Sequence, residues 1–581
     1  MKKQSIISFF ALAGCLNIFL SCKKNNSNPV TPPVLPPDTT IVIQPAVDPP
    51  LAGSIGFFLD DWQPKNFSTP TYIDTSLPAL SGYTATVDAS SIITKIPRSL
   101  FGNNANLWMT QMVTETSLIG HITNIHPHII RFPGGSISDV YFWNAADGIP
   151  PADAPTTLVQ ANGSTTSAGY WYGKNNANWT ISLDNYYNML LQTGNQGLIT
   201  INYGYARYGK SSNPVATAAH LAADWVRYDN GRTKYWEIGN ENFGDWEAGY
   251  RINVAANMGG QPEFLTGELY GQHFKVFADS MKKAAQEIGK TIYIGAVTAE
   301  AAPQSWETNT RKTWNTGMFG NSNNKADYYV VHNYFTNYQT NANATEVLST
   351  AITVPSAMMN FIKQELQTNG VTEKPIALDE WNIFSTGSMQ MVSHINGLHA
   401  DLLLGELLKN KYGMSARWDF ANGWDNGNDH AMFNIGDEPG GVPKWNPRPA
   451  FYHMYFFQKF LGDRAVNISV TGGTDVSVYA STYTSGEVGV ALINSSTSPK
   501  AIEIKVKNFR PGNRFYWYAL AGGNDNGEFS RKVFVNGRGP DYVSGGPSNY
   551  TSLPAYSAVT VNGIRVTVPA RGAVFMAIDK K

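Results

Sequence analysis

Two glutamates each stand at the end of a short run that has the composition of a β-strand. Glu241 lies in "WEIGNEN", directly after Asn240, and Glu380 lies in "LDEWN", directly before Trp381. A carboxyl group in such a position can act as a general acid, a general base or a nucleophile. One such group alone is more simply a solvated strand end. The chemistry therefore depends on whether the fold brings both carboxyls to one place.

The elements that carry these residues alternate between short apolar strands and longer amphipathic helices. Eight strand-like runs follow one another at 99–104, 128–135, 198–204, 235–241, 292–297, 327–334, 375–382 and 415–420. Helical candidates between them include 215–228, 270–289 and 394–410. Near-continuous apolar strands that alternate with helices indicate a parallel sheet. Eight such units favour a (β/α)8 barrel, and no glycine-rich phosphate loop follows a strand to favour an open doubly wound sheet.

The rest of the chain divides by composition. After about residue 460, runs with a period of two are separated by Gly, Asn and Ser turns, which is typical of a β-sandwich. The predicted organisation is a signal peptide at 1–22, a Pro/Asn/Ser-rich linker at 23–51, a segment at 52–95 that adds strands to the sandwich, the barrel at 96–458 and the sandwich at 459–581.

The N-terminal segment predicts a secreted and lipidated protein. Two lysines precede an apolar run from residue 6 to residue 20, which is too short and interrupted for a membrane span. Cys15 and Cys22 are the only cysteines, and a cysteine after such a run resembles the bacterial lipoprotein signal. Cys22 is favoured as the lipidated residue, because cleavage at Cys15 would leave "LNIFL" on the mature chain. We therefore expect a membrane-anchored lipoprotein of a bacterial cell envelope, at the outer membrane or facing the periplasm.

Composition excludes several other classes. A formal net charge of −1 gives no basic surplus for nucleic acid, and the only expected membrane contact is the lipid anchor. The folded part has no cysteine, so disulfides, thiolate nucleophiles and cysteine metal sites are excluded. No cofactor or metal is expected: residues 126–128 ("HPH") and 425–430 ("DNGNDH") are interpreted as polar segments rather than metal sites. The oligomeric state is left open.

The barrel prediction brings the two glutamates together. Glu241 ends the fourth strand-like run and Glu380 the seventh, 139 residues later. Side chains at the C-terminal ends of barrel strands converge on one face. Two carboxyls there meet the requirement of glycoside hydrolysis, which needs a protonated acid at the leaving oxygen and an ionised carboxylate below the anomeric carbon.

The motifs around these residues resemble those of a known group. "WEIGNEN", "LDEWN" and "RFPGGS" (131–136) are similar to clan A glycoside hydrolases and most closely to family 51, which holds α-L-arabinofuranosidases and some endoglucanases. The similarity runs from about residue 84 to residue 581. It implies a retaining reaction, with Glu241 as the acid/base and Glu380 as the nucleophile.

The same resemblance implies the roles of further residues. Asn240 would hydrogen-bond the sugar hydroxyl next to the anomeric centre, while Arg131 and Tyr334 would keep the nucleophile ionised and oriented. Glu237 lies deeper in its strand and Asp379 should point away from Glu380 by strand alternation, so both are interpreted as structural. Other candidates for substrate binding are His332, Asn104, Trp381 and Trp418, with Trp143 and Trp424 as weaker ones; for His332 and each tryptophan a core position is an equal alternative.

Two departures from family 51 leave the substrate open. In arabinofuranosidases of that family the first loop carries a glutamate and an asparagine follows the Pro-Gly-Gly turn. Here the first loop has Asn103 and Asn104 with no acid, and Ser136 follows the turn. The expected function is a retaining, arabinofuranosidase-like hydrolase of plant or algal poly- or oligosaccharides. The alternatives are an endo-acting β-glycanase of the glucan or xylan type and a non-catalytic glycan-binding lipoprotein, against which the presence of both glutamates argues.

Overall fold

The computed structural model describes residues 43–80 and 82–581. The predicted signal peptide, both cysteines and most of the predicted linker lie outside the described residues. Residues 43–50 contain neither helix nor strand. Within the described part of the chain, no helix combines the length and the apolar character that a membrane span requires.

Eight parallel strands close into a barrel, which confirms the predicted fold class. Each predicted run overlaps one strand, and neighbouring strands pair in parallel around the closed circle. In order around the barrel they are β3 (Gly102–Asn104), β4 (Ile129–Phe132), β9 (Gln196–Ile201), β10 (Thr233–Ile238), β11 (Tyr293–Val297), β12 (Tyr328–Asn333), β13 (Ile376–Trp381) and β14 (Met414–Arg417). Most of their residues are buried, because helices cover the outside of the barrel and side chains fill its inside.

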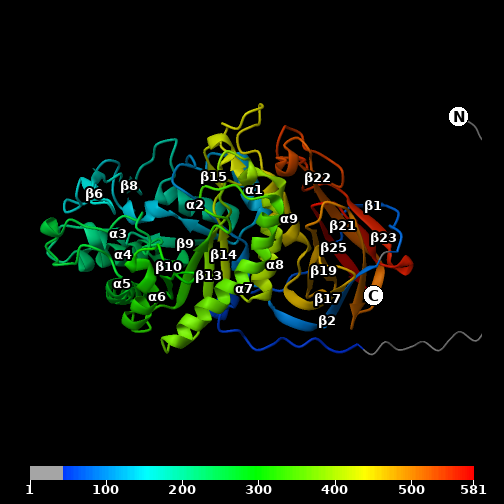
Figure 1. The fold of residues 1–581 in the computed structure, drawn as a ribbon, viewed down its shortest axis with the longest axis horizontal. Coiled ribbons are helices and arrows are strands. Elements are labelled where there is room, and N and C mark those ends of the chain that lie inside the picture. The colour runs from blue at the N-terminus through cyan, green and yellow to red at the C-terminus, as the bar shows by residue number, and fades with distance from the viewer. Residues whose placement is uncertain (1–42, 81) are drawn as a thin grey trace, which may run out of the picture. The chain divides into compact units, whose positions relative to one another are not determined.

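Helices surround the barrel, as Figure 1 shows for α4 to α7 beside β10 and β13. The described residues form α1 (Thr116–Ile125), α2 (Leu183–Thr193), α3 (Gly204–Tyr208), α4 (Pro214–Asp229), α5 (Gly267–Glu287), α6 (Asn309–Asn321), α7 (Ala344–Thr368), α8 (His394–Lys409) and α9 (Pro449–Phe460). Six of them begin after a Ser, Thr or Asn whose side chain accepts a backbone N–H of the first turn. Such caps fix the residue at which each helix begins. They therefore also set the length of the loop between that helix and the strand before it.

A short segment closes the end of the barrel opposite the two glutamates. Ile55 and Phe58, in and beside the 3-10 turn Gly56–Leu59, are buried. They share a small apolar core with Ile129, Leu198 and Tyr328 from the strand beginnings. The barrel is therefore plugged at the N-terminal ends of its strands and accessible only at the C-terminal ends.

The predicted β-sandwich is present as one continuous sheet that curls on itself. Its strands are β1 (Tyr72–Asp74), β2 (Tyr83–Lys95), β17 (Arg464–Thr471), β18 (Val476–Thr482), β19 (Val488–Asn494), β20 (Lys500–Lys507), β21 (Pro511–Gly522), β22 (Val533–Val535), β23 (Ala555–Val559), β24 (Arg565–Val568) and β25 (Gly572–Lys580). Strand β24 contacts β19 and β25, from which it is distant along the sheet. The two layers enclose an apolar core that includes Val490, Val566 and Met576.

Candidate active site

Glu380 lies on β13 and accepts hydrogen bonds from two donors, one on β4 and one directly after β12. Arg131 of β4 donates from Nη1 to Oε2 over 2.8 Å, and the Tyr334 hydroxyl donates to Oε1 over 2.7 Å. The Glu380 side chain is 6% exposed. Because both oxygens accept hydrogen bonds, one of them from a charged donor, the carboxylate is fixed in direction.

Arg131 is the centre of a buried polar network. It donates from Nε to Glu237 Oε1 over 2.9 Å and from Nη2 to Asn240 Oδ1 over 2.9 Å. The side chain is fully buried, and although burial alone would lower its pKa, the charges of Glu237 and Glu380 raise it. Arg131 therefore stays a cation and connects the strand of Glu380 to the strand of Asn240.

Glu241 follows β10 on a tight turn. Its own φ is +43° and that of Gly239 is +82°, so two of three consecutive residues are in the left-handed region. A positive φ at a residue other than glycine is uncommon and is found where surrounding contacts fix the backbone. The turn leaves the Glu241 side chain 18% exposed, three times as much as that of Glu380.

His332 of β12 lies between the two candidate catalytic carboxyls. Its Nδ1 is 2.9 Å from Glu241 Oε1 and 3.9 Å from Glu380 Oε2, and its Nε2 is 3.3 Å from Asp379 Oδ1. Burial lowers the pKa of His332, but the surrounding carboxylates overcome this effect and raise it well above 6.5. The imidazolium in turn lowers the pKa of Glu241, against the upward effect of burial. His332 is thus a buried, hydrogen-bonded histidine of the barrel that lies beside both glutamates, and its contact with a sugar stays a prediction.

Asp379 corrects the expectation from strand alternation. Its carboxylate does not point away from the site but lies against His332 inside the barrel. The pairing of β13 shifts register beside this residue on both sides, between Val331 and His332 and between Leu378 and Trp381. Such bulges turn two successive side chains to the same side, which a strict period of two does not allow.

Glu237 and Asp379 form a carboxyl pair below the site. Both are fully buried. Burial raises the pKa of Glu237 well above its ordinary range, with the Asp379 charge adding to the effect, whereas hydrogen bonds from His332 and Glu237 keep that of Asp379 low. Two carboxyls this close to each other cannot both be ionised at low cost, although Arg131 lies against Glu237 and offsets part of this cost.

Three other sequence predictions are corrected by burial. Asn104 is fully buried, donates to the Asp379 carbonyl over 2.9 Å and accepts from Arg131 over 3.0 Å, so it positions Arg131 and does not reach a substrate. Trp381 is fully buried and cannot stack on a sugar. Trp143 stacks on Trp225 in the core.

Trp418 lies at the edge of the site. It is 9% exposed and packs over the turn after β4, where a Cβ on Gly135 would come within 2.8 Å of the indole. Gly135 has a φ of +60°, so both its backbone and its surroundings require glycine. Trp418 thus fixes the Pro-Gly-Gly turn and leaves only one edge toward solvent.

Sequence reasoning missed the residues that hold Asn240. Its side-chain nitrogen donates to Glu247 Oε1 over 3.0 Å, and the Ser136 hydroxyl donates to the same oxygen over 2.7 Å. Its backbone N–H donates to Asp139 Oδ2 over 3.2 Å. These residues lie in irregular segments, where no periodicity signals a site. The only available signal was Ser136 itself, directly after the Pro-Gly-Gly turn.

Two sets of side chains are close enough to hold a metal ion. Glu237, His332 and Asp379 form one set, and Glu241, His332 and Glu380 the other, each with ligand atoms within 4.8 Å of one another. Both sets share His332, and each contains a carboxylate that Arg131 already binds. A cation in either place would lie beside two charged donors. The arrangement favours acid–base and nucleophilic chemistry over metal binding.

Comparisons with known proteins find this chain similar to glycoside hydrolases. Residues 121–346 match the family model of the alpha-L-arabinofuranosidase 1 domain, a stretch that includes Glu241 and ends before Glu380. A probable alpha-L-arabinofuranosidase C of Aspergillus terreus is 22% identical over 285 residues, which are 44% of this chain and 48% of that protein. The chain thus spans about half the length of this curated relative.

Solved structures show the same fold at low identity. The alpha-L-arabinofuranosidase of Thermotoga maritima, in an arabinose complex, superposes with a TM-score of 0.59 at 17% identity over 85% of this chain and 99% of that one. A Paenibacillus polymyxa xyloglucanase of glycoside hydrolase family 44 gives a TM-score of 0.55 at 11% identity over 86% and 99%. Both comparisons cover the barrel and the sandwich.

Proposed function

We propose that this chain is a retaining glycoside hydrolase that cleaves plant or algal poly- or oligosaccharides by double displacement, with arabinofuranosidase-like activity. The carrying observation is that Glu241 and Glu380, from different strands, bring carboxylate oxygens within 4.8 Å of each other beside one histidine. Retaining enzymes place their carboxyls about 5–5.5 Å apart, whereas inverting ones need about 6.5–9.5 Å to admit a water. The spacing here supports direct attack by a carboxylate.

In the first step, Glu380 attacks the anomeric carbon and the glycosidic bond breaks. Glu241 gives its proton to the leaving oxygen, so the alcohol departs neutral and a glycosyl ester remains on Glu380. In the second step, Glu241 takes a proton from water, and the water oxygen displaces Glu380 from the anomeric carbon. Two inversions at that carbon give net retention.

The surrounding residues set the charges for these steps. Arg131 and Tyr334 orient the Glu380 carboxylate before attack and donate hydrogen bonds to it again as it leaves. When Glu380 becomes an ester, its negative charge is lost, and with it the largest of the effects that raise the pKa of His332. Because His332 is hydrogen-bonded to Glu241, this change in the pKa of His332 also alters the proton affinity of Glu241. It occurs at the step in which Glu241 changes from acid to base.

The stereochemistry of the product tests the mechanism. Hydrolysis of an aryl glycoside is followed by NMR from the first seconds, before the product mutarotates. The substrate's anomeric configuration should appear first in the product. Initial formation of the opposite anomer would contradict the proposal. No turnover on a broad panel of plant and algal glycans, with binding retained, would support a glycan-binding protein instead.

A second candidate is an endo-acting β-glycanase of the glucan or xylan type. The first loop has no acidic residue to offer to a sugar, and the amide of its Asn104 is bound inside the barrel. Ser136, which follows the Pro-Gly-Gly turn, is bound to Glu247. A hydroxyl-binding group that is missing costs about 1–3 kcal/mol per contact, so a tight arabinofuranose pocket is weakened. Comparison of kcat/KM on an aryl α-L-arabinofuranoside with that on β-glucan and xylan oligosaccharides decides between the two. Efficient turnover of the aryl arabinoside without polymer cleavage would reject the endo candidate.

We also propose that Cys22 carries a lipid anchor that holds the enzyme at a bacterial envelope membrane. The proposal rests on the sequence of residues 1–22, which lie outside the described part of the structure.

A further inference from the structure

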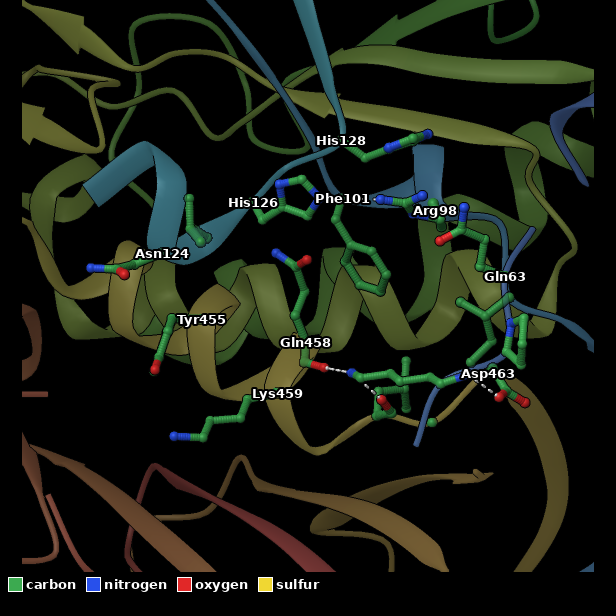
Figure 2. A pocket seen from close by; sticks show the side chains of 16 residues that line it. Gln63, Arg98, Phe101, Asn124, His126, His128, Tyr455, Gln458, Lys459 and Asp463 are labelled. Atoms are coloured by element: carbon green, nitrogen blue, oxygen red, sulfur yellow. Dashed lines mark hydrogen bonds between the residues drawn. The ribbon is translucent and has the colours of Figure 1, made fainter. Parts of the chain in front are cut away.

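A second polar cavity lies at the end of the barrel opposite the two glutamates. It has a volume of about 450 Å³ and is lined by residues 63–65, the segments just before β3 and β4, the end of α1, helix α9 and the chain entering β17. Figure 2 shows His128 and Arg98 on one side of this cavity and Gln458 and Lys459 on the other. Cavities of about 300–1,000 Å³ are the size of small-molecule sites. The catalytic residues take no part in this one.

Arg98 supplies a guanidinium without a carboxylate partner. Its Nη2 donates to His126 Nε2 over 3.1 Å, and among the described residues it forms no ion pair. The pKa of His126 is lowered by burial and by the Arg98 charge, so the ring is a neutral acceptor. Arginine has five N–H donors in a planar fork that fits a carboxylate. The remaining donors of Arg98 are therefore available to an anion.

Two further polar atoms at this cavity have no partner. Gln458 Nε2 and His128 Nδ1 are buried and form no hydrogen bond with the described residues. In Figure 2 the Gln458 amide points up toward His126, beside the ring of Phe101. His128 is 5% exposed, and burial holds its pKa near 3, so it is neutral. These two polar atoms thus keep hydrogen-bonding capacity that the described residues do not use.

The other charged groups at the cavity leave it positive. Lys459 forms no ion pair in the described part of the chain, and Lys65 donates to the carbonyls of Gln458 and Leu461. Asp463 is the one acid among the lining residues, and its oxygens accept from Lys65 and Thr484 and pair with Arg464. Asp61, nearby, pairs with Lys234. The acids are thus neutralised by other partners, while Arg98 and Lys459 are not.

The aromatic side chains of the cavity limit the kind of anion that fits it. The rings of Phe101 and Tyr455 line the same cavity. Flat rings pack against the C–H faces of sugars, and the volume exceeds the needs of a simple inorganic anion. We propose that this cavity binds an anionic sugar, the uronic acid unit of an acidic glycan, with its carboxylate on Arg98 and its ring against the neighbouring Phe101. It would hold an acidic part of a glycan at a distance from the catalytic mouth.

Titration of the full protein with a galacturonic acid disaccharide and with the matching neutral galactose disaccharide tests this site. Isothermal calorimetry and ligand-observed NMR should show binding of the acid and at least tenfold weaker binding of the neutral sugar. Arg98→Gln and Lys459→Gln should each weaken the acid at least tenfold. Lys283→Gln, an exposed lysine of α5, removes the same charge elsewhere and should have no effect.

Two controls keep this result separate from the catalytic function. Hydrolysis of a small aryl glycoside should be unchanged in both cavity variants, and Glu380→Gln should bind the acid disaccharide as the wild type does. Equal thermal midpoints exclude a folding defect. The proposal is overturned if the wild type does not bind the acid disaccharide, if both cavity variants bind it unchanged, or if sodium sulfate binds as tightly as the sugar acid.

Discussion

The Nδ1 atom of His332 lies 2.9 Å from Glu241 Oε1 and 3.9 Å from Glu380 Oε2. One imidazolium therefore faces both carboxyls that the chemistry requires. Any change in the charge of Glu380 alters the proton affinity of His332 and, through its hydrogen bond, that of Glu241. The two carboxyls that we propose as catalytic are coupled by a side chain that need not touch the sugar.

Replacement of the nucleophile should remove turnover and preserve the fold. Glu380→Gln keeps the size of the side chain and loses the charge that Arg131 and the anomeric carbon require. We expect kcat to fall by at least about 10³-fold. Initial rates on an aryl glycoside, with circular dichroism as the folding control, measure the effect. Substantial residual activity in a carefully purified sample would contradict the assignment of Glu380.

Replacement of the acid/base should depend on the leaving group. Glu241→Ala should slow substrates with poor leaving groups by about 10²–10⁴-fold and activated aryl glycosides much less. External azide should restore part of the rate, because a small anion can enter the space left by the side chain and attack the glycosyl ester. The product would then be a glycosyl azide with the substrate's configuration. An equal loss with all leaving groups, without azide rescue, would argue against this role.

Removal of His332 should move the pH profile in a defined direction. Burial raises the pKa of Glu241, whereas the hydrogen bond and charge of His332 lower it. In His332→Gln the upward effect prevails, so Glu241 keeps its proton to higher pH. The basic limb of kcat/KM should therefore shift to higher pH, together with a lower maximum. A shift of the basic limb to lower pH would instead indicate that His332 helps Glu241 to keep its proton.

Asp139 should make the protein less stable as the pH rises. Burial raises its pKa from 3.8 to about 7, although it accepts hydrogen bonds from Gly204, Asn240 and Asn242. The folded protein thus binds this proton more tightly than the unfolded chain. The contribution to the free energy of unfolding is present below about pH 4 and is lost as the pH rises through about 7, with a slope of at most ~1.4 kcal/mol per pH unit.

Urea unfolding between pH 4.5 and 7.5 measures this slope. Asp139→Asn should be less stable at each pH, because it places an amide donor against the N–H groups that the carboxylate accepts. Its unfolding free energy should nevertheless decline less steeply with pH than that of the wild type. Parallel curves for the two proteins would show that Asp139 does not titrate in this range.

Exposed aromatics on the barrel loops should matter for long substrates. Trp306 is 81% exposed on the segment after β11, at the end of the barrel that carries Glu241. If the enzyme acts inside polysaccharide chains, Trp306→Ala should raise KM for β-glucan about fivefold and leave a small aryl glycoside unchanged. Tyr542→Ala, an exposed aromatic of the sandwich region, is the control. If both variants raised KM for β-glucan equally, Trp306 would not be part of a substrate subsite.

The anchor can be tested by labelling. Cys22→Ser should abolish incorporation of radioactive palmitate and move the protein from the membrane to the soluble fraction. Cys15→Ser should do neither. Loss of the label in Cys15→Ser alone would assign the lipid to the other cysteine, and labelling of neither wild type nor variants would reject the lipoprotein proposal.

The main features of the fold were predictable because they repeat. Eight apolar runs separated by amphipathic helices gave the positions of all eight barrel strands, and the ends of the fourth and seventh runs gave Glu241 and Glu380. Alternation failed at Asp379, because a register shift in β13 depends on both neighbouring strands and leaves no mark in its own residues.

Burial could not be predicted residue by residue. Trp381 ends β13 and Trp418 directly follows β14, yet Trp381 is fully buried whereas Trp418 is 9% exposed. Asn104 looked available to a substrate because its partners, Arg131 and the Asp379 carbonyl, are distant in sequence. The hydrogen bonds that position Asn240 likewise come from loops, whose paths no periodic pattern specifies.

Strand β2 has a consequence for how the chain is made and handled. Residues Tyr83–Lys95 pair with β17 on one side and β20 on the other, both of which are synthesised roughly 370 residues or more later. At about 5–20 residues per second, this strand waits tens of seconds on the ribosome without its neighbours. An engineered fusion that takes only residues 459–581 to another enzyme would leave a gap in the middle of its sheet. Any such fusion must therefore include residues 83–95 together with the C-terminal strands, because the C-terminal region does not form a complete sheet by itself.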